Sequence, residues 1–157
     1  MKREVSVADA RDLCTAFQSL HGQMRPVKNN QQGAVILVPF DLHVAARLQM
    51  NKNIAALTGI VSAHDKAMMA RRDQINTELE DREKAINEET QDEDERAKRL
   101  QAAERELQVK MNKEASAAAD LKSEVDLDPI KREQINEGKN AFDPMALARL
   151  TNAGLLE

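Results

Sequence analysis

Residues 42–119 decide the fold, and they read LHVAARLQMNKNIAALTGIVSAHDKAMMARRDQINTELEDREKAINEETQDEDERAKRLQAAERELQVKMNKEASAAA. This stretch contains no proline, and Gly59 is its only glycine. Proline and glycine are the residues that most weaken a helix, so a run of this length without them predicts long helix. The proline-free run extends to Asp128, which Pro129 follows.

The run changes character along its length. Its first part is rich in apolar side chains, whereas 18 of the 29 residues from Arg71 to Arg99 are charged. Large apolar residues recur at intervals of seven, in two sets whose phases differ by four residues. The first set is Ile54, Val61, Met68 and Ile75, and the second consists of the pairs Leu79 with Ile86 and Leu100 with Leu107. Such broken heptads predict a thin seam, either the core face of an amphipathic helix or a contact between helices within or between chains.

The run either continues as one straight helix or folds back near residues 87–92. Asn87 suits the left-handed position that ends a helix. Thr90 with Glu93, or Asp92 with Glu95, matches a capping box that would start a second helix. A straight helix over residues 41–119 would be about 115 Å long and remains the alternative.

Charge favours the fold-back. Residues 78–95 hold ten acidic and two basic side chains, and residues 96–113 hold six basic and two acidic ones. A turn near residue 90 is expected to lay Lys98 and Arg99 beside residues 80–83. Farther from the turn the match is expected to fail, because Arg71 and Arg72 would face Lys110.

Shorter elements are expected on both sides of the long run. Ser6 is a candidate N-cap of a helix that Gly22 ends. Residues 24–27 and 34–40 predict a β-hairpin, and residues 121–127 predict a strand whose expected partner is Val35–Val38. Asp143 and Pro144 are typical of the start of a last, short helix.

Together these features predict an α+β fold that is predominantly α. A small base with a short β-sheet is expected over residues 1–50 and 120–157, and a long antiparallel helical hairpin of coiled-coil type over residues 51–119. Asp41 is a candidate cap for a helix that begins at Leu42.

Composition excludes several classes of protein. Leu, Ile, Val and Phe make up 34 of the 157 residues, too few for one large globular core. Cys14 is the only cysteine, so neither a disulfide framework nor a thiolate zinc cluster is expected. The apolar runs are too short for a membrane span or a leader. The chain has a net charge of −4 and lacks Trp and Tyr, so we expect no nucleic-acid partner.

The sequence carries no pattern typical of catalysis. His21, His43 and His64 do not have metal-ligand spacing, and the five glycines never cluster into a phosphate loop. The acidic stretch 88–95 lacks the glycine and the alternation of a calcium loop. We therefore expect no catalytic, cofactor-binding or metal-binding residues. We also expect that the protein is not an enzyme.

Three segments resemble small helical structural proteins of tailed phages. They are Leu13–Leu20, the strand that ends in Val38-Pro39-Phe40, and Leu48–Val61; the closing helix with Leu147 and Leu150 is similar to the same group. The resemblance implies a non-enzymatic virion or assembly component that is assembled in the host cytoplasm and contacts other virion proteins.

A cytoplasmic helical-hairpin adaptor or holdase chaperone is the alternative function. A holdase grips its clients through exposed apolar side chains, and residues 87–95 at the expected tip offer none. An adaptor with a basic partner stays open.

We also expect the chain to associate with itself. The first arm carries more large apolar side chains than the alanine-rich residues 97–119 can cover, and a patch of this size is seldom left in water. A dimer, a trimer or a ring around another virion protein would each cover it. The predicted interface residues are Ile54, Leu57, Val61, Met68, Ile75, Leu79, Ile86, Leu100 and Leu107.

Overall fold

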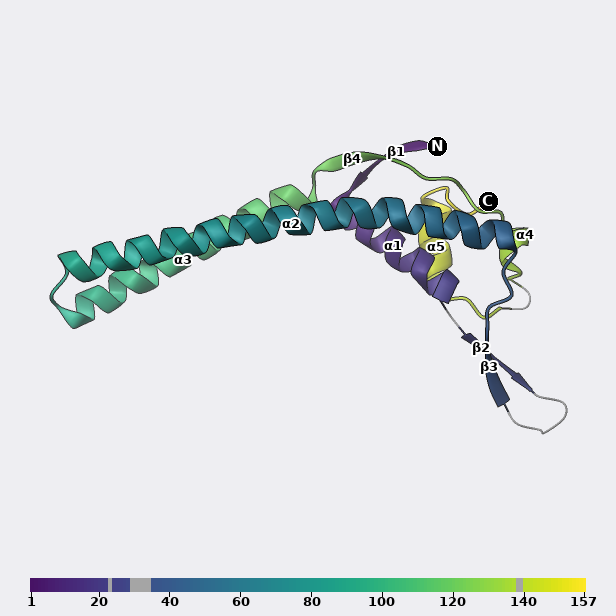
Figure 1. The fold of residues 1–157 in the computed structure, drawn as a ribbon, viewed down its shortest axis with the longest axis horizontal. Helices are drawn as coiled ribbons and strands as arrows, with labels where there is room; N and C mark the ends of the chain where they lie inside the picture. The colour runs from purple at the N-terminus through teal and green to yellow at the C-terminus, as the bar shows by residue number, and fades with distance from the viewer. Residues whose placement is uncertain (23, 29–34, 138–139) are drawn as a thin grey trace. The chain divides into compact units, whose positions relative to one another are not determined.

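A computed structural model describes residues 1–22, 24–28, 35–137 and 140–157, with the backbone alone over 24–28 and 35–37. Helix predominates, and the predicted α+β class is confirmed (Figure 1). The elements in chain order are β1 (Lys2–Ser6), α1 (Val7–Gly22), β2 (Met24–Lys28), β3 (Val35–Pro39), α2 (Val44–Glu89), α3 (Glu93–Ala119), β4 (Lys122–Asp126), α4 (Arg132–Ile135) and α5 (Pro144–Asn152).

The chain divides into two compact units. Unit 1 comprises residues 1–61 and 122–157, and unit 2 comprises residues 62–121. Helix α2 therefore contributes its first part to unit 1 and its second part to unit 2. The sequence predicted these boundaries at residues 50 and 119.

One sheet of unit 1 joins β1 to β4. The two strands are antiparallel, with Lys2 opposite Asp126 and Ser6 opposite Lys122. The predicted pairing of residues 121–127 with Val35–Val38 is therefore wrong. Strand β1 escapes a search for apolar alternation because Val5 is its only large apolar residue, and Val5 is buried in the core.

The predicted β-hairpin is confirmed in its strands. Strands β2 and β3 pair antiparallel, from Met24 opposite Pro39 to Lys28 opposite Val35. Most of the loop that joins these two strands lies outside the described residues. Pro26 is compatible with strand β2, because each strand of a two-stranded sheet is an edge strand, where proline is tolerated.

The core of unit 1 is built around α1. Its buried side chains recur every three or four residues, as one face of a helix requires; they are Val7, Ala10, Leu13, Ala16, Phe17 and Leu20. Helix α5 packs against α1 (Figure 1), with Ala146 and Leu150 buried.

The expected helix ends are mostly confirmed. The Ser6 hydroxyl accepts a hydrogen bond from the Asp9 N–H at 3.0 Å, which caps α1. Asp143 accepts from the Met145 N–H at 3.0 Å, and Pro144 is the first residue of α5. Gly154, with φ of 59°, adopts the left-handed conformation just after that helix.

The predicted start of the long helix is wrong by two residues. Helix α2 begins at Val44 rather than Leu42. The backbone of Asp41 is engaged elsewhere: its N–H donates to Asn140 Oδ1 at 3.0 Å, and its carbonyl accepts from Asn136 Nδ2 at 2.9 Å. These bonds tie residue 41 to the chain before α5, so the helix starts after it.

Asn53 fixes the first part of α2 to the segment after β4. Its side chain is fully buried and bonds the backbone of Asp128 twice, donating to the carbonyl at 2.9 Å and accepting from the N–H at 3.2 Å. The carboxylate of Asp128 accepts from Lys52 Nζ at 2.7 Å. Hydrogen bonding from Lys52 lowers the pKa of Asp128 to about 2. The buried Leu127 and Ile130 are thereby set in register with α2.

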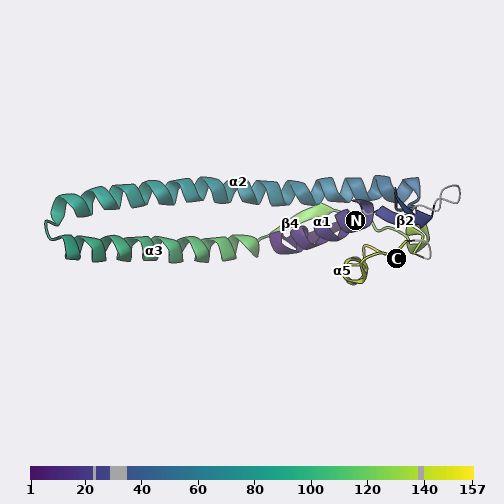
Figure 2. The same ribbon diagram turned by 90° about the horizontal axis from the view of Figure 1, so that it is seen from below.

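Unit 2 is the predicted antiparallel hairpin, and the straight-helix alternative is excluded (Figure 2). The chain turns at residues 90–92, and Asp92 caps α3 by accepting from the Glu95 N–H at 2.8 Å. The expected end of the helix at Asn87 is wrong, because Asn87 lies inside α2. Thr90, which is buried, continues the helical bonding by donating its N–H to the Ile86 carbonyl at 3.0 Å.

Over the ranges that the structure describes, no helix is both long enough and apolar enough to cross a membrane.

Removal of most of unit 2 should leave unit 1 folded. Residues 72–113 are deleted, and Arg71 is joined to Glu114 by a short glycine linker, because these two side chains already meet at 2.9 Å. The core cluster of unit 1 lies outside the deletion, from Val5 to Leu57 and from Val125 to Leu156. Calorimetry should show one cooperative unfolding transition. Gradual melting without a heat-absorption peak would show that unit 1 needs the hairpin.

Candidate functional site

The two arms of unit 2 are held together by ion pairs as well as by apolar contacts. Arg71 binds Glu114 through two hydrogen bonds, from Nε at 2.5 Å and from Nη2 at 2.9 Å. Lys110 Nζ donates to Glu78 at 3.0 Å. These bridges lie on the faces where α2 and α3 meet, since all four side chains are only partly exposed.

A third bridge lies nearer the turn. Arg82 donates from Nη1 to Glu106 at 3.1 Å and from Nη2 to Glu78 at 2.8 Å. Glu78 thus accepts from both arms, which links the second and third bridges into one network.

The predicted charge pairing along the arms is wrong in detail. Lys98 and Arg99 do not lie beside residues 80–83; Arg99 instead lies near the turn, 3.7 Å from Glu89 and 3.0 Å from Glu95. The expected repulsion farther from the turn is also wrong, because Arg71 binds Glu114. The bonded residues of α3 lie three to six positions beyond those that a count outward from residue 91 places opposite their partners.

The nine predicted interface residues fall into two groups. In unit 1, Leu57 is buried in the core, with Ile54 and Val61 packed against it. In unit 2, Ile75 and Leu107 are buried, with 7% and 2% of their surfaces exposed. The other four in unit 2 are half-buried: Met68, Leu79, Ile86 and Leu100.

Much of the predicted stripe is therefore covered by the chain's own packing. Ile54, Leu57 and Val61 are covered within unit 1. A polar substitution at Val61 would disturb the fold of unit 1, so it cannot by itself report on association.

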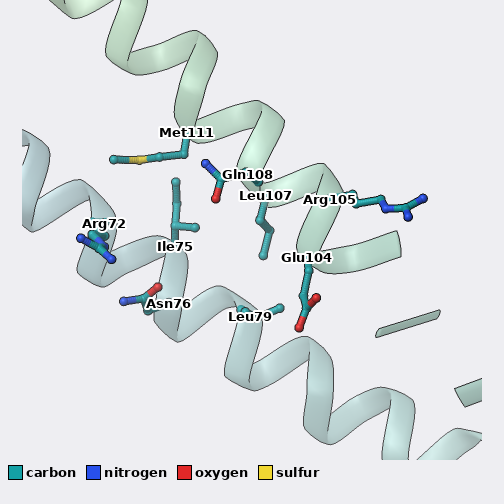
Figure 3. A pocket seen from close by; sticks show the side chains of 9 residues that line it. All are labelled: Arg72, Ile75, Asn76, Leu79, Glu104, Arg105, Leu107, Gln108 and Met111. Carbon is teal, nitrogen blue, oxygen red and sulfur yellow. The ribbon is translucent and has the colours of Figure 1, made fainter. Parts of the chain in front are cut away.

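A groove of about 650 Å³ remains open on one face of the hairpin. Ile75 and Leu79 of α2 and Leu107 and Met111 of α3 supply its apolar lining (Figure 3). Its polar lining residues are Arg72, Asn76, Glu104, Arg105 and Gln108. In Figure 3 the Glu104 side chain points toward Leu79, whereas that of Arg105 points away from α2.

Three of the four apolar groove residues were predicted from the sequence, whereas Met111 and the polar lining residues were not. A signal for the pairing was present, because a turn at residues 90–92 brings the stretch that contains Ile75 and Leu79 beside the stretch that contains Leu107 and Met111. The polar lining residues could then have been identified on the neighbouring turns of each helix.

Two other reactive side chains are not among those that line the groove. Cys14 is half-buried in unit 1, with Sγ 3.6 Å from the hydroxyl oxygen of Thr58. In unit 2, His64 places Nδ1 3.2 Å from the Asp65 carboxylate, and 14% of its side chain is exposed. Among the described residues, no group of three or more His, Cys, Asp or Glu side chains could hold a metal ion.

No protein-family model matches this chain, and neither a curated protein nor a solved structure matches it. The hairpin and its groove are therefore the observations from which a function can be argued.

Acid should weaken the hairpin. Hydrogen bonding from Lys110 lowers the pKa of Glu78, and hydrogen bonding from Arg71 lowers the pKa of Glu114. A carboxylate with a lowered pKa stabilises the fold above its unfolded value of 4.5, and this contribution is lost as the pH falls through the lower, folded value. The thermal midpoint of the helical circular dichroism signal should therefore fall as the pH drops below about 5.

Paired variants isolate these two groups. Replacing Glu78 and Glu114 with Gln should lower the midpoint at pH 7 and flatten its dependence on pH. Replacing Glu80 and Glu88, which are exposed and form no ion pair in the described part of the chain, should leave the pH dependence as in the parent protein. Equal pH profiles for the two double variants would contradict the assignment.

Proposed function

We propose that this chain is a non-enzymatic structural or assembly protein that works by packing its helical hairpin against other helices. The observation that carries the proposal is the groove, an apolar strip bounded by charged and amide side chains. A pair of helices buries only one stripe of each helix, and a bundle covers the remaining apolar surface by adding further helices. The polar rim around an apolar centre is also the usual composition of a protein interface.

Two exposed apolar side chains of the hairpin fit the same role. Met69 and Val109, on the two arms of the hairpin, have 68% and 67% of their surfaces exposed. Large apolar side chains on both arms would add to the area that a packed helix covers.

The proposal places the chain in a tailed-phage particle, with itself and other virion proteins as partners and with assembly in the host cytoplasm. This placement rests on the resemblance of Leu13–Leu20 and Leu48–Val61 to the small helical structural proteins of such phages. It involves no nucleic acid and no membrane.

The alternative is a cytoplasmic adaptor that binds a basic protein partner through the hairpin tip. The observation in its favour is that Glu88, Glu89 and residues 92–95 are all exposed and acidic. Electrostatic complementarity would attract a basic surface to this tip. The same composition disfavours the holdase, whose clients need apolar contacts.

The composition of purified particles tests the proposal. Particles are isolated from a lysate of cells that produce the chain, and their peptides are counted by mass spectrometry. The chain should be present at a repeating copy number, and the variant without residues 72–113 should be missing from the particles. A control with Glu80→Gln, an exposed residue outside the groove, should be incorporated normally. Recovery of the intact chain in the soluble fraction alone would contradict the proposal and favour the adaptor.

A further inference from the structure

Two charges at the rim of the groove differ from the charges beside them. The neighbouring Arg71, Glu78 and Lys110 all take part in ion pairs between the arms. Throughout the described ranges, by contrast, the side chains of Arg72 and Glu104 have no ion-pair or hydrogen-bond partner. Arg105, the other charged residue of the lining, also has no such partner, but its side chain points away from α2 (Figure 3). The groove is therefore lined by the unpaired Arg72 and Glu104, with the unpaired Arg105 at its outer side, in addition to its apolar residues.

The unpaired cation and anion lie at opposite ends of the groove. The three bridges between the arms, Arg71 to Glu114, Lys110 to Glu78 and Arg82 to Glu106, place Glu104 level with residues 81–84 of α2. Arg72 is nine to twelve residues from that level, or about 14–18 Å along the helix axis. The midpoint between the two charges is level with residues 76–78.

The apolar lining has the same centre. Ile75 and Leu79 lie on either side of this level on α2, and by the same register Leu107 and Met111 lie on either side of it on α3. A second copy can therefore be rotated by a half-turn that exchanges the two ends of its groove. The apolar groove residues of this copy then lie over the same apolar residues of the first copy. This rotation also brings Arg72 of each copy level with Glu104 of the other.

The net charge of the hairpin is distributed in the same way as these two groove charges, with the negative charge nearer the turn. Residues 78–109, which include the turn, hold twelve acidic and six basic side chains, a net charge of −6. Residues 62–77 and 110–121 hold four acidic and five basic side chains, a net charge of +1. When a second hairpin packs end for end, the half with a charge of −6 in each copy lies beside the half with a charge of +1 in the other. When the two hairpins pack tip to tip, the two halves with a charge of −6 lie beside each other, and their repulsion opposes this arrangement.

The geometry points to a second copy of this chain as the occupant of the groove, packed end for end so that two hairpins form an antiparallel four-helix arrangement. This inference rests on the proposed role in helix packing and names the partner, the surface and the orientation. The contact is isologous, so each charge pair occurs twice in the dimer.

Charge reversal tests the pairing. Sedimentation equilibrium of the full chain should show a dimer. Arg72→Glu and Glu104→Arg should each raise the dissociation constant by roughly tenfold, because each reversal turns two exposed attractive pairs into repulsive ones. The double variant should restore dimerisation to near the parent value. Lys113→Glu and Glu80→Arg make the same charge changes on exposed residues outside the groove, and should have little effect.

Orientation is measured by a spin label at residue 87. Asn87→Cys is labelled in a Cys14→Ser background, and the distance between the labels of one dimer is read by pulsed electron resonance. The end-for-end arrangement separates them by about 27–32 Å along the axis, whereas a tip-to-tip arrangement places them at one level.

Four results would overturn the inference. They are a monomer at 100 µM concentration, labels at one level, a double charge variant that dimerises no better than the single variants, and equal weakening by the control variants. A monomeric chain that is still incorporated into particles would overturn this inference and leave the proposed function standing. A dimeric chain that is missing from particles would do the reverse.

Discussion

The ion pairs between α2 and α3 determine which residues of the hairpin face each other. In unit 2, Ile75 and Leu107 are the only large apolar side chains that the described structure buries below one tenth exposure. Two such side chains contribute too little to choose one register among several. The paired charges supply the choice, since a slip of one heptad would bring Lys110 level with Arg71 and set two cations against each other.

The open groove follows from this ionic seam. Charged side chains at Arg71, Glu78 and Arg82 occupy positions that a coiled coil of two helices would normally fill with apolar residues. Leu79 and Met111 each follow one of the paired charged residues, Glu78 and Lys110, and they are consequently half-buried at one face of the hairpin. A hairpin built in this way is held together by polar contacts and keeps part of its apolar surface for another helix.

Much of the fold could be predicted from local signals in the sequence. The lack of proline and glycine predicted the long helices, the opposed charge blocks predicted the turn, and Asp92 with Glu95 marked the start of α3. Strand β1 could not be found in this way, because the burial of Val5 depends on pairing with a strand more than one hundred residues away. The wrong choice of Val35–Val38 as the partner of β4 has the same origin.

The candidate site was only partly predictable for a related reason. The interval of seven between Ile54 and Ile75 suggested one continuous stripe, yet α2 passes from unit 1 to unit 2 between them. Ile54 accordingly packs on the core of unit 1, and Ile75 lies in the hairpin. The unpaired charges of Arg72 and Glu104 become visible only after the pairing of their neighbours is known.

The claim that ion pairs set the register is tested most directly by a double-mutant cycle at Arg71 and Glu114. The measured quantity is the thermal midpoint of the helical circular dichroism signal. Arg71→Glu and Glu114→Arg should each lower it, since each places two like charges in the seam. The combined variant should regain most of the loss, because the exchanged pair meets in the same register. A combined loss equal to the sum of the two single losses would contradict the account.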